Sequence, residues 1–118
     1  MDYTLYSFVL QHLDPFQKGI QTAHAITEYA NSYSKTSEYM RWANVNKEIS
    51  VHDVENYQKM MEIMESFQKM GLKYEYFEDK ELNRIVTSIV VIIEDDLWDL
   101  KNDDKNYEKI REILDSCG

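Results

Sequence analysis

The chain has 118 residues, of which 43% are hydrophobic and 30% charged, and its formal net charge is −9 at pH 7. Such a length and composition suit one domain with one modest core. The acidic balance opposes non-specific binding to nucleic acid, because affinity for phosphate depends on Lys and Arg. We therefore expect a single domain over residues 1–118 that does not recognise nucleic acid by charge.

Cysteine usage and hydropathy indicate the compartment. Cys117 is the single cysteine, so a disulfide framework or a CxxC metal site within the chain is excluded. The first residues after Met1 lack the basic region of a signal peptide, and no apolar run reaches 18 residues. We expect a cytoplasmic protein with no membrane partner.

The first 33 residues have the pattern of a strand, a loop and a helix. Residues 3–13 are rich in Tyr, Phe, Val and Leu, which favours a strand, and Pro15 is expected to end it. Residues 14–19 then form a loop, and a helix runs from about Lys18 to about Tyr33. This order is typical of the start of a βα unit.

The spacing of about 100° per residue predicts two unlike faces on this helix. One face is small and apolar, fit to pack on a sheet: Gly19, Ala23, Ile26, Ala30 and Tyr33. The opposite face is a row of polar side chains: Gln17, Gln21, His24 and Glu28. We expect the polar face to point away from the sheet.

Two more helices and a short strand are expected up to residue 71. Thr36 or Ser37 can cap a short helix that ends at about residue 43 and carries Trp42 as an apolar anchor. Residues 47–52 alternate as in a strand, and Asp53 is expected to cap a long helix over residues 54–70. An apolar stripe marks that helix: Tyr57, Met60, Met61, Met64 and Phe67. Gly71 is expected to end it.

The remaining segments complete an α/β pattern. Residues 73–77 predict a third strand, and the nearly unbroken apolar run over residues 85–93 predicts a strand buried on both faces. The closeness of these two strands in the sequence favours an antiparallel pair, although the link over residues 78–84 is long for a hairpin. Acidic residues around Trp98 indicate a solvated turn, and Tyr107, Ile110 and Leu114 mark a last amphipathic helix. The predicted class is a single α/β domain.

His24 is the sharpest candidate for chemistry. It lies near the start of a helix that follows the carboxyl end of a strand, where α/β proteins commonly bind ligands. Glu28, one turn later, could orient or charge the imidazole as a proton-transfer pair. The ligand-binding residues expected around this junction, including a cation for an anionic ligand, are Gln17, Lys18, Gly19, Gln21, His24 and Glu28.

Rival sites are weaker. Phosphate-binding glycine motifs, a G-x-S-x-G nucleophile motif and an H-E-x-x-H metal motif do not occur in the sequence. His12 and His52 could approach His24 and hold Zn²⁺, but their spacing is too loose to carry the prediction. The acidic pairs near Trp98 lack the spacing of a calcium loop. We therefore expect neither a metal nor a cofactor.

The segment Lys-Gly-Ile-Gln-Thr-Ala-His-Ala, residues 18–25, resembles the signature helix of the type II peptidyl-tRNA hydrolases. The long helix, Gly71 and the strand that ends near Asp79 extend this resemblance over roughly residues 3–94. A phage and bacterial branch of the superfamily, with a Gly-Ile-Gln-x-Ala-His-Ala helix and a later Trp-Ala-Asn, looks closer still. The resemblance implies a mixed four-stranded sheet flanked by helices, and often a homodimer.

The resemblance also implies where catalysis would occur. It carries over His24, with Asp79 and Thr87 matching the family's aspartate and one threonine, and Gln21 matching its glutamine. The family's lysine position, counted back from the histidine, holds Gln17, and Lys18 is displaced by one residue. A lost cation would remove charge stabilisation from an ester-cleaving site. The proline- and glycine-rich loop before the last strand is replaced by residues 80–84.

Three functions follow. The first hypothesis is a non-hydrolytic binder of a nucleotide-like or anionic ligand or of a host protein, for example a phage counter-defence protein. The second is an active peptidyl- or aminoacyl-tRNA hydrolase with Lys18, His24, Asp79 and Thr87 as catalytic residues, although the acidic charge disfavours tRNA. The third is a dimeric interaction module without a small-molecule site. Whether the protein is an enzyme is left open, and a bacterial or phage-infected cell is the expected setting.

Overall fold

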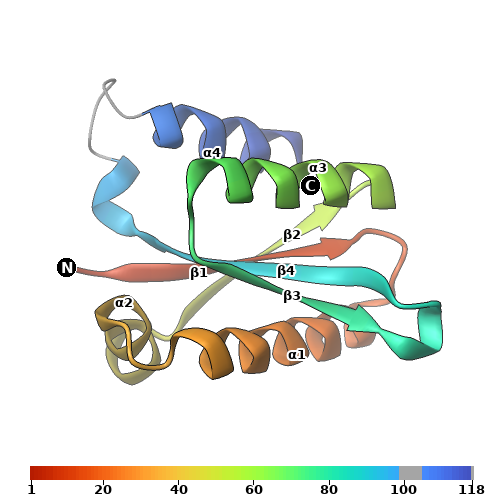
Figure 1. Ribbon diagram of the computed structural model, residues 1–118, viewed down its shortest axis with the longest axis horizontal. Coiled ribbons are helices and arrows are strands. Elements are labelled where there is room, and N and C mark those ends of the chain that lie inside the picture. Colours follow the sequence, from red (N-terminus) through yellow and green to blue (C-terminus); the bar gives the residue numbers. More distant parts are fainter. Residues whose placement is uncertain (99–104, 118) are drawn as a thin grey trace.

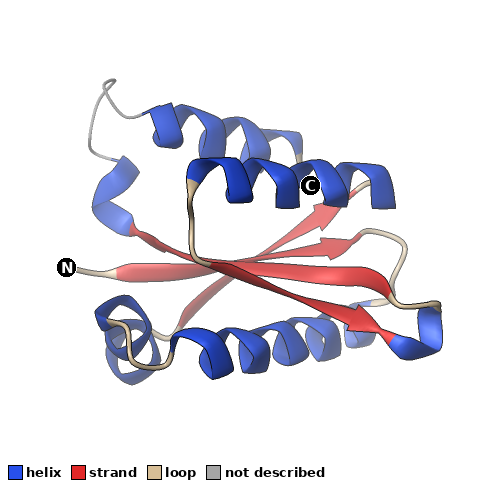
Figure 2. Ribbon diagram, in the orientation of Figure 1, coloured by secondary structure: helices blue, strands red, loops and turns tan. Residues whose placement is uncertain are grey.

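A four-stranded sheet in the order β2-β1-β4-β3 forms the middle layer of the protein (Figure 1). The computed structural model describes residues 1–98 and 105–117. The strands are β1 (Tyr3–Leu10), β2 (Glu48–Val54), β3 (Tyr74–Asp79) and β4 (Ile85–Glu94). Helix α1 (Pro15–Tyr33) and the short α2 (Ser37–Arg41) lie on one face, while α3 (Tyr57–Met70) and α4 (Lys105–Ser116) lie on the other (Figure 2). The expected mixed sheet between helices is confirmed.

The strand pairing places β1 and β4 at the centre. β1 pairs in parallel with β2 and antiparallel with β4, and β3 pairs antiparallel with β4. Every residue from Val86 to Val91 is buried, because helices cover both faces of β4. The predictions of a buried central strand and of an antiparallel pair are both confirmed.

Helix α1 begins earlier than the sequence pattern indicated. Asp14 accepts the backbone N–H of Gln17 (2.8 Å) as an N-cap, and Pro15 occupies the first turn. The prediction of a loop over residues 14–19 was therefore wrong. Proline has no N–H to donate, but the first turn of a helix does not need one, so Pro15 starts the helix.

The predicted faces of α1 are confirmed only in part: Ile26 and Tyr33 pack against the apolar cluster on this side of the sheet, and His24 and Glu28 are exposed, as expected. The buried residues of this helix are Gln21, Thr22, Ala25 and Tyr29. Gly19 and Ala23, which were expected to pack, are exposed. The sheet presents buried hydroxyl groups to α1, so polar side chains of the helix can be buried with their hydrogen bonds made. A hydrophobic period cannot reveal such a contact.

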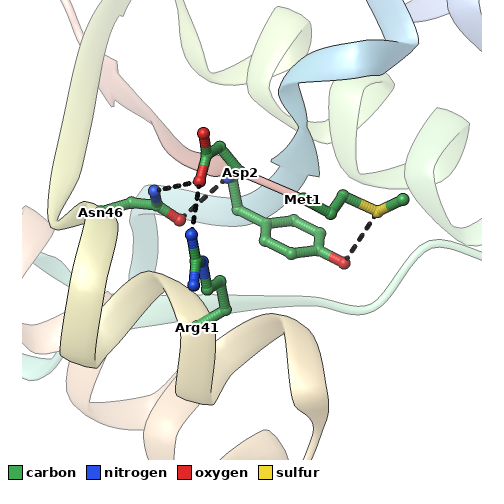
Figure 3. A network of polar contacts seen from close by, with 5 residues as sticks. Met1, Asp2, Arg41 and Asn46 are labelled. Carbon is green, nitrogen blue, oxygen red and sulfur yellow. Dashed lines mark hydrogen bonds and ion pairs between the residues drawn. The ribbon is translucent and has the colours of Figure 1, made fainter.

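A π-helical turn (Trp42–Asn46) continues α2 and leads into β2. Trp42 is buried, and its indole N–H donates to the carbonyl of Glu48 (2.7 Å), which confirms it as an anchor. Figure 3 shows the other attachment of this segment: Asp2 accepts from Asn46 (2.9 Å) and pairs with Arg41 (3.1 Å). These donors lower the pKa of Asp2. The segment is thus tied to the start of β1.

The boundary between β2 and α3 differs from the expectation. Pairing with β1 extends β2 to Val54, and Asn56, not Asp53, caps α3 by accepting the backbone N–H of Lys59 (2.9 Å). Gly71 ends α3 with a φ of 70°, as predicted, because glycine adopts this left-handed conformation without strain.

The two faces of the sheet have separate apolar clusters. Under α3 and α4 the cluster includes Phe8, Met60, Phe67 and Ile110, whereas Leu5, Ala25, Tyr29, Trp42 and Val90 form the cluster under α1. Tyr57 of the expected α3 stripe is exposed, and Ile63 takes its place in the core.

The last predicted features are described in part. Leu114 packs with the first cluster as expected, while Asp103, Asp104 and the side chains of Trp98 and Tyr107 lie outside the described residues. Within residues 1–98 and 105–117, no helix has the length and apolar character required to cross a membrane.

Candidate functional site

A hollow of about 500 Å³ opens between the first half of α1 and the carboxyl end of β3. We call it the α1–β3 pocket. Its lining residues are Gln17, Ile20, Gln21 and His24 from α1, and Phe77, Glu78, Asp79, Lys80 and Glu81 from β3 and the turn after it. Three predicted site residues from α1 and one from β3 therefore meet in one concave surface. This volume is in the range of small-molecule sites.

Gln21 is the hydrogen-bonding centre beneath the pocket. Its amide N–H donates to Oδ2 of Asp79 (2.9 Å), and its side-chain oxygen accepts the hydroxyl of Thr87 (2.7 Å). Its backbone carbonyl accepts the hydroxyl of Ser88 (2.7 Å). Gln21 is only 2% exposed, so these bonds lock its orientation in a buried environment. The amide thus links α1 to both β3 and β4.

His24 covers an aromatic ring at the mouth of the pocket. Its imidazole stacks on Phe77 with ring centroids 4.3 Å apart and an interplanar angle of 12°. His24 itself is exposed, whereas Phe77 is half-buried. The outer face of the imidazole is therefore available as a flat surface for a ligand ring.

Two expected ligand residues lie elsewhere. Lys18 forms an ion pair with Asp53 of β2 (2.8 Å between Nζ and Oδ1) and is absent from the lining of the α1–β3 pocket. Gly19 is exposed, and a Cβ added there would have no neighbour within 4 Å, so no close backbone approach requires glycine. Gln17 occupies the pocket side of the first turn instead.

Glu28 and Thr87 are close to the pocket but do not line it. Thr87 is fully buried under Gln21. Glu28 lies in an adjoining hollow of about 280 Å³ together with Glu75, Tyr76, Phe77 and Glu78. The two hollows share Phe77 and Glu78, so α1 and β3 border one continuous surface.

The charge of the α1–β3 pocket is predominantly negative. Three carboxylates, those of Glu78, Asp79 and Glu81, line it, and Lys80 is the one lysine among its lining residues. The two carboxylate oxygens of Asp79 accept hydrogen bonds from uncharged donors, the side-chain amide of Gln21 and the backbone N–H of Glu81 (2.9 Å), so its negative charge remains in the pocket. A pocket of this charge does not favour a phosphate group.

The three histidines do not come together. His52 lies on the opposite face of the sheet, where its ring contacts Tyr6 and Phe8 and its Nε2 hydrogen bonds with Ser50 (2.8 Å). Burial lowers the pKa of His52. Among the described residues, no group of three or more His, Cys, Asp or Glu side chains could hold a metal ion.

Several site residues were missed from the sequence. Phe77 was assigned only to a strand, and the turn residues Glu78, Lys80 and Glu81 only to a charged connection. The sequence contains one indication that these residues belong to the site. They lie next to Asp79, which the resemblance matches to the family's aspartate. Which ring stacks on His24 depends on how β3 packs beside α1 in the folded protein. Local sequence patterns contain no information about this packing.

Comparison with known proteins agrees with this geometry. The family described as "Peptidyl-tRNA hydrolase PTH2" matches residues 16–95, more than half of the chain. A search of curated proteins found no match. The matched range includes α1 from its second residue, all of β3 and β4, and every residue that lines the α1–β3 pocket. The chain belongs to the peptidyl-tRNA hydrolase PTH2 family.

Proposed function

We propose that this protein uses the peptidyl-tRNA hydrolase fold to bind a nucleotide-like ligand in the α1–β3 pocket without hydrolysing an ester. The observation that carries the proposal is the arrangement of the first turn of α1. Gln17 faces the pocket where the related hydrolases are expected to have a lysine, and Lys18 is held by Asp53. An ester-cleaving site without that cation would lack stabilisation of the developing negative charge.

The ligand is recognised through its base and not through its phosphate. The stacked pair of His24 and Phe77 offers a ring surface, and Gln17 offers an amide at the same pocket. Stacking on aromatic side chains is a common way of holding a base and tolerates many ring types. The carboxylates of Glu78 and Glu81 would repel a phosphate group.

A thermal-shift comparison of nucleosides with the corresponding monophosphates tests this proposal. Adenosine and guanosine are expected to raise the melting temperature more than AMP and GMP, because binding stabilises the folded state. His24→Ala should abolish the shift, whereas His12→Ala, an exposed histidine outside the pocket, should preserve it. Equal shifts in His24→Ala and wild type, or no shift with any probe, would contradict the proposal.

The second candidate is an active peptidyl- or aminoacyl-tRNA hydrolase. The observation that favours it is the joining of Gln21, Asp79 and Thr87 by hydrogen bonds beside His24. Single-turnover cleavage of a charged tRNA distinguishes the two candidates. The binder predicts cleavage at the buffer rate for wild type and a measurable gain for Gln17→Lys. The hydrolase predicts activity in wild type that His24→Ala and Lys18→Ala reduce.

The biological setting follows from the same proposal. A protein that holds a nucleoside without cleaving an ester could act in the cytoplasm of a phage-infected cell by sequestering a host signal that presents an unphosphorylated nucleoside or base. In a second form of this role, the acidic rim of the pocket would hold a basic side chain of a host enzyme. If neither nucleosides nor a partner depended on His24, the protein would act as a dimeric module without a small-molecule site.

A further inference from the structure

A second hollow, of about 290 Å³, lies at the end of the sheet opposite the α1–β3 pocket. β4 extends to Glu94, past Val91, which is the residue opposite the start of β3 at Tyr74. Figure 1 shows the start of β1, the end of β4 and the connection from α3 to β3 at this end of the sheet. We call the hollow the α2–β4 pocket, because Glu38 of α2 and residues 92–94 of β4 line it. Its volume is at the lower limit of small-molecule sites.

Tyr29 of α1 forms the inner wall of the α2–β4 pocket and has an unsatisfied hydroxyl group. The residue is only 1% exposed, and among residues 1–98 and 105–117 its hydroxyl has no hydrogen-bond partner. In this described part of the chain, no side-chain oxygen or nitrogen is both fully enclosed and unpaired, so the small exposed area of Tyr29 includes its hydroxyl oxygen. Buried tyrosine hydroxyls usually have a partner. This hydroxyl therefore opens into the pocket and can bind a molecule there.

Two carboxylates converge on the same space. Glu94 lies opposite Tyr3 in the pairing of β4 with β1, and Tyr3 packs with the apolar cluster under α1, so both side chains are on this face of the sheet. Glu38 approaches the pocket from α2. Burial, Glu38 and Glu94 raise the pKa of Tyr3. Burial, Glu38 and Tyr33 raise the pKa of Tyr29. The glutamates are therefore close enough to the tyrosine hydroxyls to act on them electrostatically.

Lys73 is the one basic residue that lines the α2–β4 pocket, and it does not neutralise both acids. Its Nζ lies 3.9 Å from Oε1 of Glu38 and its side chain is 52% exposed, so this ion pair is weak. Within the described residues, the side chain of Glu94 has neither an ion pair nor a hydrogen bond. The carboxylates of the lining outnumber its lysine by one. One positive charge on a ligand would therefore balance the pocket.

We propose that the α2–β4 pocket binds a small primary amine with an apolar body, in its protonated form. An ammonium group has three N–H donors, and the pocket offers three acceptors: the hydroxyl of Tyr29 and the carboxylates of Glu38 and Glu94. Ile92 and Ile110 line the same hollow and suit the apolar body of the ligand. The two glutamates would repel a carboxylate or a phosphate. This site is independent of the function proposed for the α1–β3 pocket.

An NMR titration of isotope-labelled protein with phenethylamine tests both the binding and its place. The neutral phenethyl alcohol and the anionic hydrocinnamate carry the same ring on a chain of similar length. We expect the amine to bind at least about tenfold more tightly than either, because only the amine forms charge-assisted hydrogen bonds with the glutamates. The backbone amide signals of residues 71–73 and 92–94 should shift. Equal affinity for the three compounds, or shifts centred on residues 79–81 of the α1–β3 pocket, would overturn the proposal.

Two substitutions test the acceptors one at a time. Tyr29→Phe removes a hydroxyl that has no hydrogen-bond partner among the described residues, so the melting temperature should not fall. We expect Tyr29→Phe to weaken phenethylamine binding at least about threefold and Glu94→Gln about tenfold. The controls are Tyr33→Phe, a neighbouring tyrosine outside the lining, and Glu81→Gln in the α1–β3 pocket, and both should keep the wild-type affinity. Unchanged affinity in either Tyr29→Phe or Glu94→Gln, or an equal loss in Glu81→Gln, would contradict the proposal.

Discussion

Gln21 connects three elements of the fold with one side chain. It is buried, and its amide is shared between Asp79 at the end of β3 and Thr87 in β4. A buried amide of this kind fixes the position of Asp79 in the pocket, because the cost of leaving a buried polar group unpaired is large. Gln21 is therefore a positioning residue for the pocket and also a structural one.

Replacing Gln21 by Leu is expected to lower the free energy of unfolding by about 1–3 kcal/mol, because the buried hydroxyl of Thr87 loses its 2.7 Å acceptor and keeps only the longer contact with the carbonyl of Phe77 (3.4 Å). Urea denaturation measures the change. Gln58→Leu, at an exposed position on α3, serves as the control and should change stability by less than about 0.5 kcal/mol. Adding Thr87→Val to Gln21→Leu should restore part of the loss. If it restored none, the hydrogen bond would not be the source of the effect.

The identity of the candidate residues could be predicted at this scale, but their roles could not. The resemblance of the sequence to the family singled out Gln21, His24 and Asp79, and the structure brings all three to one pocket. Lys18 was placed in the same group because it is adjacent in sequence. Lys18 instead forms an ion pair with Asp53 of β2. Successive residues of a helix point about 100° apart, so Lys18 is turned toward β2 while its neighbour Gln17 lines the pocket.

Helix α1 docks on the sheet through buried hydroxyl groups as well as apolar contacts. Ser7 of β1 and Thr22 of α1 are both buried and their hydroxyl oxygens are 2.8 Å apart. Ser88 donates to the backbone of the same helix. This pattern explains why the hydrophobic period of α1 predicted only part of the buried face, since the contact surface of the helix is partly polar.

A double-mutant cycle on Ser7 and Thr22 measures this contact. Thr22→Val should destabilise the protein by about 1–2 kcal/mol, because Ser7 keeps a buried hydroxyl without a partner. Ser7→Ala combined with Thr22→Val should cost less than the sum of the single changes. The unfolding free energies from urea denaturation give the coupling energy. Strict additivity of the two changes would show that the hydroxyl contact contributes nothing to docking.

At the scale of the whole molecule, the negative net charge is the property that differs most from what a tRNA-binding protein needs. The net charge is −9, and three of the carboxylates that contribute to it line the α1–β3 pocket. Affinity for nucleic acid depends largely on release of counterions by Lys and Arg. The acidic surface is therefore consistent with a member of this family that does not use tRNA.

Filter binding with deacylated tRNA at physiological salt is expected to give a dissociation constant weaker than about 10 μM for wild type. The double variant Glu78→Lys, Glu81→Lys should bind more tightly, because it reverses the charge at the rim of the pocket. Lys59→Glu, on the opposite face, is a control that should not increase binding. Submicromolar binding by wild type would contradict this prediction and favour the hydrolase.

The sequence by itself determined the alternation of elements, the buried character of β4, the stop at Gly71 and the family. These features depend on local chemistry: β-branched runs favour strands, and glycine ends helices. Only the tertiary structure decided which face of α1 is buried, where Lys18 points and how His24 meets Phe77. Each of these depends on groups that distant strands place beneath or beside the helix, and hydrophobic periodicity contains no information about such partners.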